Sequence, residues 1–335
     1  MHFMAWMGLT GGLIAAAVLV ASGFGGSGAV AQDSSCTYRG TLADRYCDMN
    51  RDMLADQPLD SDQWADPATL IFSYVPVEDP AVYKDTFAPF MEHLAEVTGK
   101  NVRFFSAQSN AAQIEALRSG RLHIAGLSTG ATAFGVNIAG FHPFAIMGTD
   151  DGGYGYKMQV ITPANSPIDS VPDLKGKRVA HTEQSSNSGN QAPRALLESE
   201  FGIVPGEDYE VAYSGGHDRS ILGVANGDYA AAPVASTVLD RMVARGAVDM
   251  NNIRVIHTSR SFPTTGYGYA HDMHPRLKLL IQKAFYSFDF AGTKLGEEFS
   301  GVDGFLPITY KKDWKVIRTI QQQNDVSYTR DNISG

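Results

Sequence analysis

The sequence predicts an α/β protein of two lobes that the chain connects twice. Three strand–loop–helix units at 70–130 imply parallel strands with crossover helices, and a second set of strand and helix patterns at 156–258 is again α/β. Two further helical patterns near the C-terminus are most economically packed back onto the first sheet. The chain then crosses between the lobes near residues 155 and 263, which predicts a hinge with a cleft between the lobes.

Length and composition fit this architecture and exclude one class of partner. The 335 residues suffice for two domains, and 44% apolar with 19% charged residues is typical of a globular protein. A net charge of -9 and the lack of a basic stripe argue against a nucleic-acid partner. A small anionic ligand stays possible, because local backbone N–H groups bind anions whatever the overall charge.

Residues 1–31 read as a secretory signal peptide. They contain no Asp, Glu, Lys or Arg, and the apolar run 13–20 is followed by the cleavage pattern Ala29-Val30-Ala31. An uncleaved membrane anchor is the alternative. Four glycines at 23–28 interrupt the apolar run short of the roughly 20 residues that a span needs, which favours cleavage and a periplasmic location.

A polar, acidic extension is expected at 32–66, before the first lobe. Its Cys36 and Cys47 are the two cysteines of the chain, and in an exported protein they predict a local disulfide. No Cys/His spacing suggests zinc. The oxygen-rich side chains of the extension lack the calcium-loop spacing and its central glycine, so we expect a solvated loop and no metal site; they are Asp48, Asn50, Asp52 and Asp56.

The first lobe is expected to alternate buried strands with helices that end at glycines. The predicted elements are a strand at 70–75, a helix at 83–98, a strand at 102–105, a helix at 111–118 and a strand at 122–126. The loops after these strands lie at one edge of the sheet, which is where open α/β sheets bind ligands.

The second lobe follows a Gly/Asp-rich break at 149–155. Its expected elements are strands at 157–162, 178–181, 209–213 and 254–258, helices at 195–201, 219–226 and 238–245, and a small-residue run at 230–237. After the segment 266–270, helices at 275–288 and 314–324 are expected to return to the first lobe.

A run of hydroxyl and amide side chains at 182–194 separates a strand from a helix. Pro193 is tolerated only in the first turn of that helix, which therefore begins near 188–191. Free N–H groups there, with the hydroxyls of Ser185, Ser186 and Ser188, would make an anion seat. An ordinary capped loop is an equally open interpretation, since Ser and Asn are common N-caps.

Other polar loops are placed to face the same cleft. The first lobe offers Ser128 and Thr129, with Tyr74, Glu78 and Tyr83 near the end of its first strand; the second offers His217 and Asp218. His217 is open to two interpretations, a ligand contact or a helix cap. Hydroxyls and amides dominate, and this composition suits a tetrahedral oxyanion held by neutral donors.

An enzyme is the alternative from another class. The segment 126–130 matches G-x-S-x-G, with Ser128 as the candidate nucleophile and His217 and Asp218 later in the chain. No HGGG-type oxyanion motif precedes the match. We therefore expect neither catalysis nor a cofactor.

Several of these motifs together resemble one family. The chain is similar, over about 70–322, to the PhnD-type periplasmic binding proteins of ABC importers for phosphonate, phosphite and related phosphorus oxyanions. The segments that carry the resemblance are Asp79-Pro80, 117–125, 173–177, the serine-rich 185–193, Gly216-His217-Asp218 and 224–227.

The resemblance implies a type II periplasmic-binding-protein fold, a Venus flytrap that closes on one oxyanion. It implies ligand contacts from Ser128 and Thr129, from Ser185, Ser186 and Ser188, from His217 with its neighbour Asp218, and from Tyr83. Lobe 1 would comprise 67–155 with 264–330, and lobe 2 would comprise 156–263. The implied partners are the ligand and the membrane subunits of the importer, with the binding protein acting as a monomer.

One departure from the family bears on the ligand. Aminophosphonate binders carry acidic groups for the ligand amine, whereas 262–265 and 232–235 of this chain contain no carboxylate. We therefore expect a small ligand such as phosphite, phosphate or methylphosphonate. A sensor domain that feeds a membrane kinase would use the same fold and is not separated by sequence.

Overall fold

The computed structural model describes residues 36–78 and 81–333. The predicted signal peptide at 1–31 and the Asp79-Pro80 pair lie outside the described residues. Across the part that is described, no helix combines the length and the apolar character that a membrane span requires.

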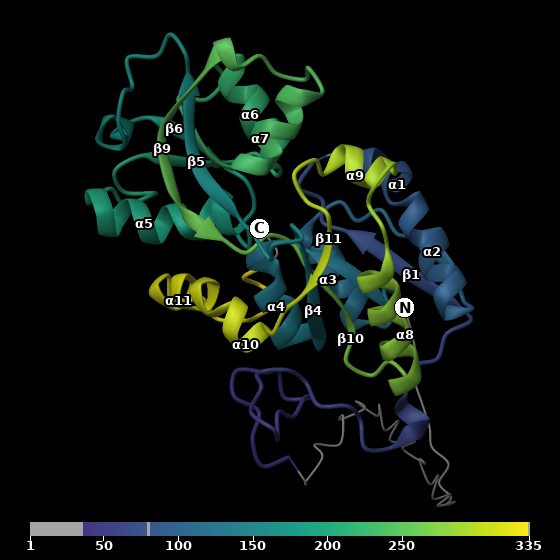
Figure 1. The fold of residues 1–335 in the computed structure, drawn as a ribbon. Coiled ribbons are helices and arrows are strands. Elements are labelled where there is room, and N and C mark those ends of the chain that lie inside the picture. Colours follow the sequence, from purple (N-terminus) through teal and green to yellow (C-terminus); the bar gives the residue numbers. More distant parts are fainter. Residues whose placement is uncertain (1–35, 79–80, 334–335) are drawn as a thin grey trace, which may run out of the picture. The chain divides into compact units, whose positions relative to one another are not determined.

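The first sheet has six strands in the order β11-β4-β10-β3-β1-β2 (Figure 1). Their bounds are β1 (Thr69–Tyr74), β2 (Asn101–Phe104), β3 (Ile124–Leu127), β4 (Phe141–Gly148), β10 (Gly266–Ala270) and β11 (Gly304–Pro307). β1 pairs in parallel with both β2 and β3, as the alternating pattern predicts. β10 runs antiparallel between β3 and β4, so the returning chain enters the middle of this sheet.

Helices from both ends of the chain cover this sheet. They are α1 (Ala81–Thr86), α2 (Ala88–Thr98), α3 (Asn110–Arg118), α4 (Thr129–Ala139), α8 (Pro275–Ser287), α9 (Lys294–Glu298), α10 (Tyr310–Asp313) and α11 (Lys315–Gln323). α2 and α8 lie side by side (Figure 1). The ring centroids of Phe90 on α2 and Phe285 on α8 lie 4.6 Å apart in an edge-on arrangement, inside an aromatic core. Such pairs stabilise the fold beyond the burial of their apolar surface.

The prediction of a single helix at 83–98 is wrong in one respect. The structure divides it into α1 and α2, with Phe87 between them. Pro89 explains the division, because it has no N–H to donate to the carbonyl of Asp85. The helix predicted at 314–324 is confirmed as α11, and the short helix α10 before it was not predicted.

The second lobe contains a three-stranded antiparallel sheet, β8-β5-β9, and the parallel pair β6-β7. The bounds are β5 (Tyr156–Pro163), β6 (Arg178–His181), β7 (Glu210–Tyr213), β8 (Ala232–Ala235) and β9 (Ile253–Phe262). A bridge from Val179 to Ala231 joins the two groups of strands. The helices are α5 (Ala192–Phe201), α6 (His217–Ala225) and α7 (Ser236–Ala244).

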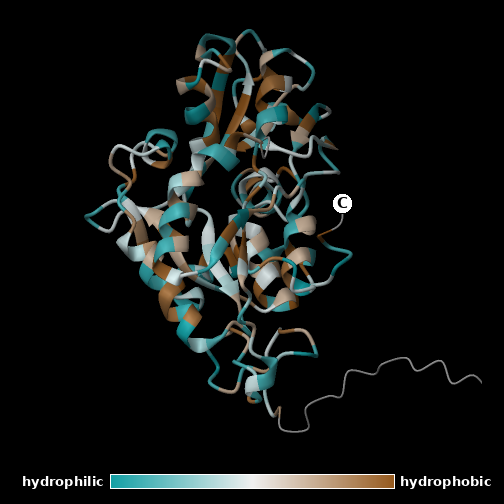
Figure 2. Ribbon diagram, turned by 90° about the vertical axis from the view of Figure 1, so that its right-hand side faces the viewer, coloured by the Kyte–Doolittle hydropathy of each residue, from teal (hydrophilic) through white to brown (hydrophobic). Residues whose placement is uncertain are grey.

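Two connections join the sheets. The chain leaves the first sheet after β4 through 149–155 and returns from β9 to β10 through 263–265. The last helix, α11, packs against α4 as expected, and it also contacts α5 of the second lobe. Hydrophobic residues follow the strands and the inward faces of the helices, and hydrophilic residues follow the outer loops (Figure 2).

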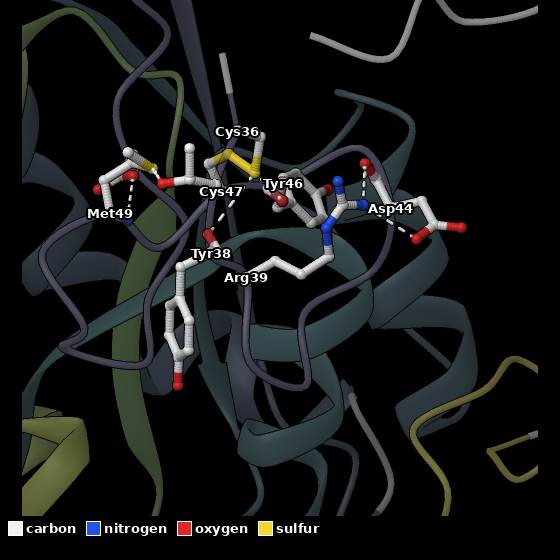
Figure 3. Close-up of a disulfide and its surroundings, with 9 residues drawn as sticks. Cys36, Tyr38, Arg39, Asp44, Tyr46, Cys47 and Met49 are labelled. Carbon is white, nitrogen blue, oxygen red and sulfur yellow. Dashed lines mark hydrogen bonds and ion pairs between the residues drawn. A yellow bond between two sulfur atoms is a disulfide. The ribbon is translucent and has the colours of Figure 1, made fainter. Parts of the chain in front are cut away.

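The N-terminal extension packs against the first lobe. The predicted disulfide between Cys36 and Cys47 is present (Figure 3). The backbone N–H of Ala43 donates to the carbonyl of Asn137 on α4. The side chain of Asp48 accepts the backbone N–H groups of Asp52 and Met53 at 2.9 and 3.1 Å, which fixes a turn. Within 36–78 and 81–333 no group of three acidic, His or Cys side chains is arranged to hold a metal ion.

Candidate functional site

A cavity of about 540 Å³ is lined by residues of both lobes. Its polar lining gathers at the N-terminal ends of four helices. These residues are Ser128 and Thr129 at α4, Ser186, Asn187 and Ser188 before α5, His217 at α6 and Thr237 at α7. Hydroxyls, one amide and one imidazole therefore face the space from these helix ends, and none of these groups carries a fixed charge.

Helix ends contribute a positive potential to this space that does not depend on formal cations. The cap residues of α4, α6 and α7 are Ser128, Gly216 and Ala235, and none of their side chains bonds to a first-turn N–H. The partial positive charge of a helix N-terminus lies in these N–H groups. Several of them directed toward one cavity favour an anion over a neutral or cationic molecule.

The serine-rich stretch forms a π-helical turn (Asn187–Gln191) that leads directly into α5. The turn begins where the sequence predicts, because Pro193 occupies the first turn of α5. Ser186 caps the turn, and its Oγ accepts the N–H of Gly189 at 3.2 Å. This bond leaves the hydroxyl proton of Ser186 free, so the capping role and a donor role toward the cavity are compatible.

Five of the eight predicted contact residues line the cavity, namely Ser128, Thr129, Ser186, Ser188 and His217. Tyr83, Ser185 and Asp218 are not among the lining residues. Tyr83 is fully buried and donates its hydroxyl proton to Glu78 at 2.8 Å. Ser185 is also fully buried, and its Oγ accepts a proton from Asn110 at 3.1 Å.

Thr129 holds one of the connections between the lobes. Its hydroxyl is 2.9 Å from the carbonyl of Pro263 and 3.2 Å from that of Thr264, and it donates to this pair. A hydroxyl has a single proton, so the side chain of Thr129 is committed to the connection. What Thr129 offers to the cavity is its backbone N–H in the first turn of α4.

His217 is a neutral donor in this structure. Its Nδ1 accepts the backbone N–H of Ala235 at 3.2 Å, which places the imidazole proton on Nε2. Burial lowers the pKa of His217 to about 4, so the ring is uncharged at neutral pH. Gly216 and not His217 is the cap residue of α6, and His217 lines the cavity, so its ligand contact stays a prediction.

Four charged side chains close one side of the cavity, and sequence reasoning missed their arrangement. Arg241 lies on α7 and Arg245 is its C-cap residue, and both face Glu78 after β1 and Glu298 on α9. Arg241 is 2.8 Å from Glu78, Arg245 is 2.7 Å from Glu298, and Arg245 also pairs with Glu78. Burial opposes ionisation of Glu78, but the two guanidinium groups hold its pKa below the ordinary value.

This cluster matters for any anion in the cavity. Both arginines line the space, yet each is paired with carboxylates of the other lobe. The spacing of Arg241 and Arg245 is visible in the sequence, since residues four apart share a helix face. Nothing in the sequence indicates that this face meets Glu78, which is 163 residues from Arg241.

Carboxylates also reach the cavity from segments that the sequence did not indicate. Ala235, Thr264 and Thr265 line it, and as expected these segments contribute no acid. Asp240, Glu297 and Glu298 line it as well, from α7 and α9. Helices that are distant in sequence from these two segments therefore supply carboxylates to the lining.

The geometry around Ser128 does not resemble a catalytic pair. Its hydroxyl donates to Oδ1 of Asn110 at 3.1 Å. Among the hydrogen bonds of the described residues, none joins Ser128 to a histidine. An activated serine needs a base within hydrogen-bond reach, so the G-x-S-x-G match lacks its partner here.

Comparison with known proteins identifies the family. The family model for the periplasmic substrate-binding protein of phosphonate ABC transporters matches residues 72–314. The chain belongs to this family. Members are periplasmic binding proteins, so the family agrees with the resemblance seen in the sequence.

Two curated relatives are similar over more than half of the chain. The phosphate-import protein PhnD of Mycolicibacterium smegmatis is 27% identical over 61% of this chain and 67% of its own length. The phosphonates-binding periplasmic protein of Escherichia coli is 26% identical over 58% of each chain. The aligned region thus spans between about half and two thirds of these relatives.

Solved structures share the type II fold. A binding component of a phosphonate ABC transporter from Pseudomonas aeruginosa superposes with a TM-score of 0.70 at 20% identity, covering 79% of this chain and 90% of that one. PhnD1 from Prochlorococcus marinus, solved in complex with methylphosphonate, gives 0.68 at 15% identity, covering 78% and 99%. This phosphonate-binding-protein fold accounts for the two sheets and the two connections of the present chain.

Proposed function

We propose that this chain captures a small phosphorus oxyanion in the cavity and delivers it to the membrane subunits of an ABC importer. The observation that carries the proposal is the convergence of four helix N-termini and three serine hydroxyls on one space. The names of the relatives support the ligand class, since one imports phosphate and another binds phosphonates.

The proposed ligand oxygens are held by neutral donors. Ser186 and Ser188 contribute hydroxyl protons from lobe 2, and His217 adds the proton on Nε2. The hydroxyl proton of Ser128 goes to Asn110, so Ser128 contributes from lobe 1 through its oxygen, which accepts a proton from a protonated ligand oxygen. Each such bond contributes roughly 1 kcal/mol net, and more when the acceptor is charged. Six or more bonds, with helix N–H groups included, reach micromolar affinity after ordering costs are subtracted.

The proposed ligand remains small, with phosphite, phosphate and methylphosphonate as the candidates. The methylphosphonate complex of a protein with the same fold supports this size. Asp240 and Glu297 line the cavity, and carboxylates there would pair with a ligand amine. This observation favours a second candidate ligand, one that carries an amine. 2-Aminoethylphosphonate is therefore the competitor that a binding experiment must include.

Export and assembly complete the proposal. Residues 1–31 act as a signal peptide that is cleaved after Ala31, and the mature chain works in the periplasm as a monomer. A sensory role on the same fold would leave ligand capture unchanged and would replace only the membrane partner.

Isothermal titration of the mature chain with these four ligands tests the proposal. We expect micromolar or tighter binding of phosphite, phosphate or methylphosphonate, and weaker binding of the amine. Ser128→Ala and Ser186→Ala should each weaken binding by about five- to tenfold, the loss of one charge-assisted bond. Ser199→Ala, at the far end of α5, is the matched control. Unchanged affinity in both site variants contradicts the assignment, and tightest binding of the amine contradicts the ligand size.

A fluorophosphonate probe separates binding from catalysis. A serine hydrolase is labelled at its nucleophile, whereas a binding protein is not. We expect no label on the wild-type chain, with an active serine hydrolase as the positive control. Labelling that disappears in Ser128→Ala would establish the hydrolase instead.

A further inference from the structure

Asn110 connects the two hydroxyl-bearing loops of the site. It is the first residue of α3, and only 5% of its surface is exposed. Its Oδ1 accepts the hydroxyl proton of Ser128 at 3.1 Å, and its Nδ2 donates to the hydroxyl of Ser185 at 3.1 Å. One amide thus bonds a hydroxyl of lobe 1 and a hydroxyl of lobe 2.

The main chain of Asn110 extends the same contact. Its backbone N–H donates to Oε2 of Glu183 at 3.2 Å, so a second bond from this residue reaches the serine-rich stretch. Burial raises the pKa of Glu183 to about 7, and the hydrogen bonds from Asn110 act in the opposite direction.

The backbones meet beside this amide. A Cβ placed on Gly130, in the first turn of α4, would lie 2.0 Å from the carbonyl oxygen of Ser185 and 2.9 Å from the N of Asn187. No side chain fits at such a distance, so glycine is required for the approach. The start of α4 and the serine-rich stretch are therefore in direct contact with each other.

A purely local role does not explain Asn110. The N-terminus of α3 is already capped by Ser109, whose side chain accepts the N–H of Ala112 at 3.1 Å. The amide of Asn110 is therefore not needed to start its own helix. Asn110 is also absent from the cavity lining, which excludes a direct ligand contact in this conformation.

We propose that Asn110 is a positioning residue for ligand capture, which holds Ser128 and the serine-rich stretch at a fixed separation across the two lobes. The inference rests on the proposed function. Because the amide bonds both loops without touching the ligand, it stabilises the closed arrangement and slows ligand release. Ser185, which is buried beneath the lining, acts through Asn110.

A double-mutant cycle with Asn110→Ala and Ser185→Ala tests this role. The probe is whichever of phosphate, phosphite and methylphosphonate binds the wild-type chain most tightly, with affinity from titration and dissociation from stopped-flow mixing. We expect each variant to weaken affinity by about fivefold or more, mainly through faster dissociation. The double variant should be no weaker than Asn110→Ala alone.

Asn137→Ala is the control for a merely structural effect. Asn137 is a buried amide on α4 that accepts from Thr41 and donates to the carbonyl of Ala133, and it is not among the lining residues. This variant should lower the melting temperature and leave the dissociation rate unchanged. If Asn110→Ala fails to fold, Ser185→Ala carries the test alone.

The outcomes separate a failure of this inference from a failure of the proposed function. A wild-type chain that binds none of the three probes overturns the proposed function and this inference with it. A wild-type chain that binds, with unchanged affinity in Asn110→Ala or Ser185→Ala, overturns the inference alone. Strictly additive losses in the double variant also overturn it, because they show that the two side chains act independently.

Discussion

Glu183 is a carboxyl group held in surroundings that disfavour its charge. Burial raises its pKa from 4.5 to about 7, while the hydrogen bonds from Asn110 and the charge of Arg219 partly offset this effect. In the unfolded chain the same group has an ordinary pKa. Between pH 4.5 and 7 the folded chain therefore binds more protons at this site than the unfolded chain does.

This difference makes stability fall as pH rises through that window. We expect Glu183→Gln to remove the effect, so that its free energy of unfolding exceeds that of the wild type by an amount that grows by about 1–3 kcal/mol from pH 4.5 to 7. Denaturant unfolding of both proteins at several pH values measures this difference.

Comparison of the two proteins is needed because other groups titrate nearby. Burial lowers the pKa values of His181 and His217 to about 4, so these residues add stability as pH rises toward 6.5. Both histidines are present in wild type and variant, and their effect cancels in the difference. If the difference in free energy of unfolding between the wild type and Glu183→Gln is the same at every pH, the pKa of Glu183 is not raised in the folded chain.

Two arginines at the C-terminal end of α7, Arg241 in the helix and Arg245 at its C-cap, form ion pairs between the lobes. Arg241 and Arg245 have 12% and 31% of their side chains exposed, and Glu78 opposite them has 3%. Pairs this buried are costly to break, since removal of one partner leaves an uncompensated charge. The ion pairs therefore stabilise the closed arrangement without using the ligand.

Arg245→Met should speed ligand release. It removes the contacts to Glu78 and Glu298 and leaves Arg241 in place. Because Arg245 is partly exposed, we expect a modest loss, with dissociation about five- to tenfold faster in stopped-flow mixing.

Arg178→Met is the matched control. Its ion pair with Glu210 is 53% and 69% exposed and lies within lobe 2, so its removal should leave dissociation unchanged. Equal rates in wild type and Arg245→Met would show that the cluster does not hold the lobes together.

Most individual elements are predictable because their signals are local. Strand β1 contains the apolar run Leu70-Ile71-Phe72, and the glycines that end α2 and α5 adopt the left-handed conformation at φ 68° and 64°. The short edge strand β11 escapes detection, since four residues paired on one side leave no periodic signal.

The whole site is less predictable than its parts. Ser128, Ser186 and His217 are found by their position after strands and at helix starts, a rule that applies to any open α/β sheet. Asn110 and Ser185 are 75 residues apart, and their contact depends on how the two lobes meet. That geometry is set by the two connections, and no local pattern encodes it.

A crystal structure of the mature chain with its tightest-binding oxyanion tests the central claim most directly. We expect the phosphorus group inside the cavity, with its oxygens at about 2.5–3.0 Å from the hydroxyls of Ser128, Ser186 and Ser188 and close to Nε2 of His217. Arg241 and Arg245 should keep their carboxylate partners. An oxyanion bound outside the cavity, or held there by the two arginines in place of the hydroxyls, would contradict the account.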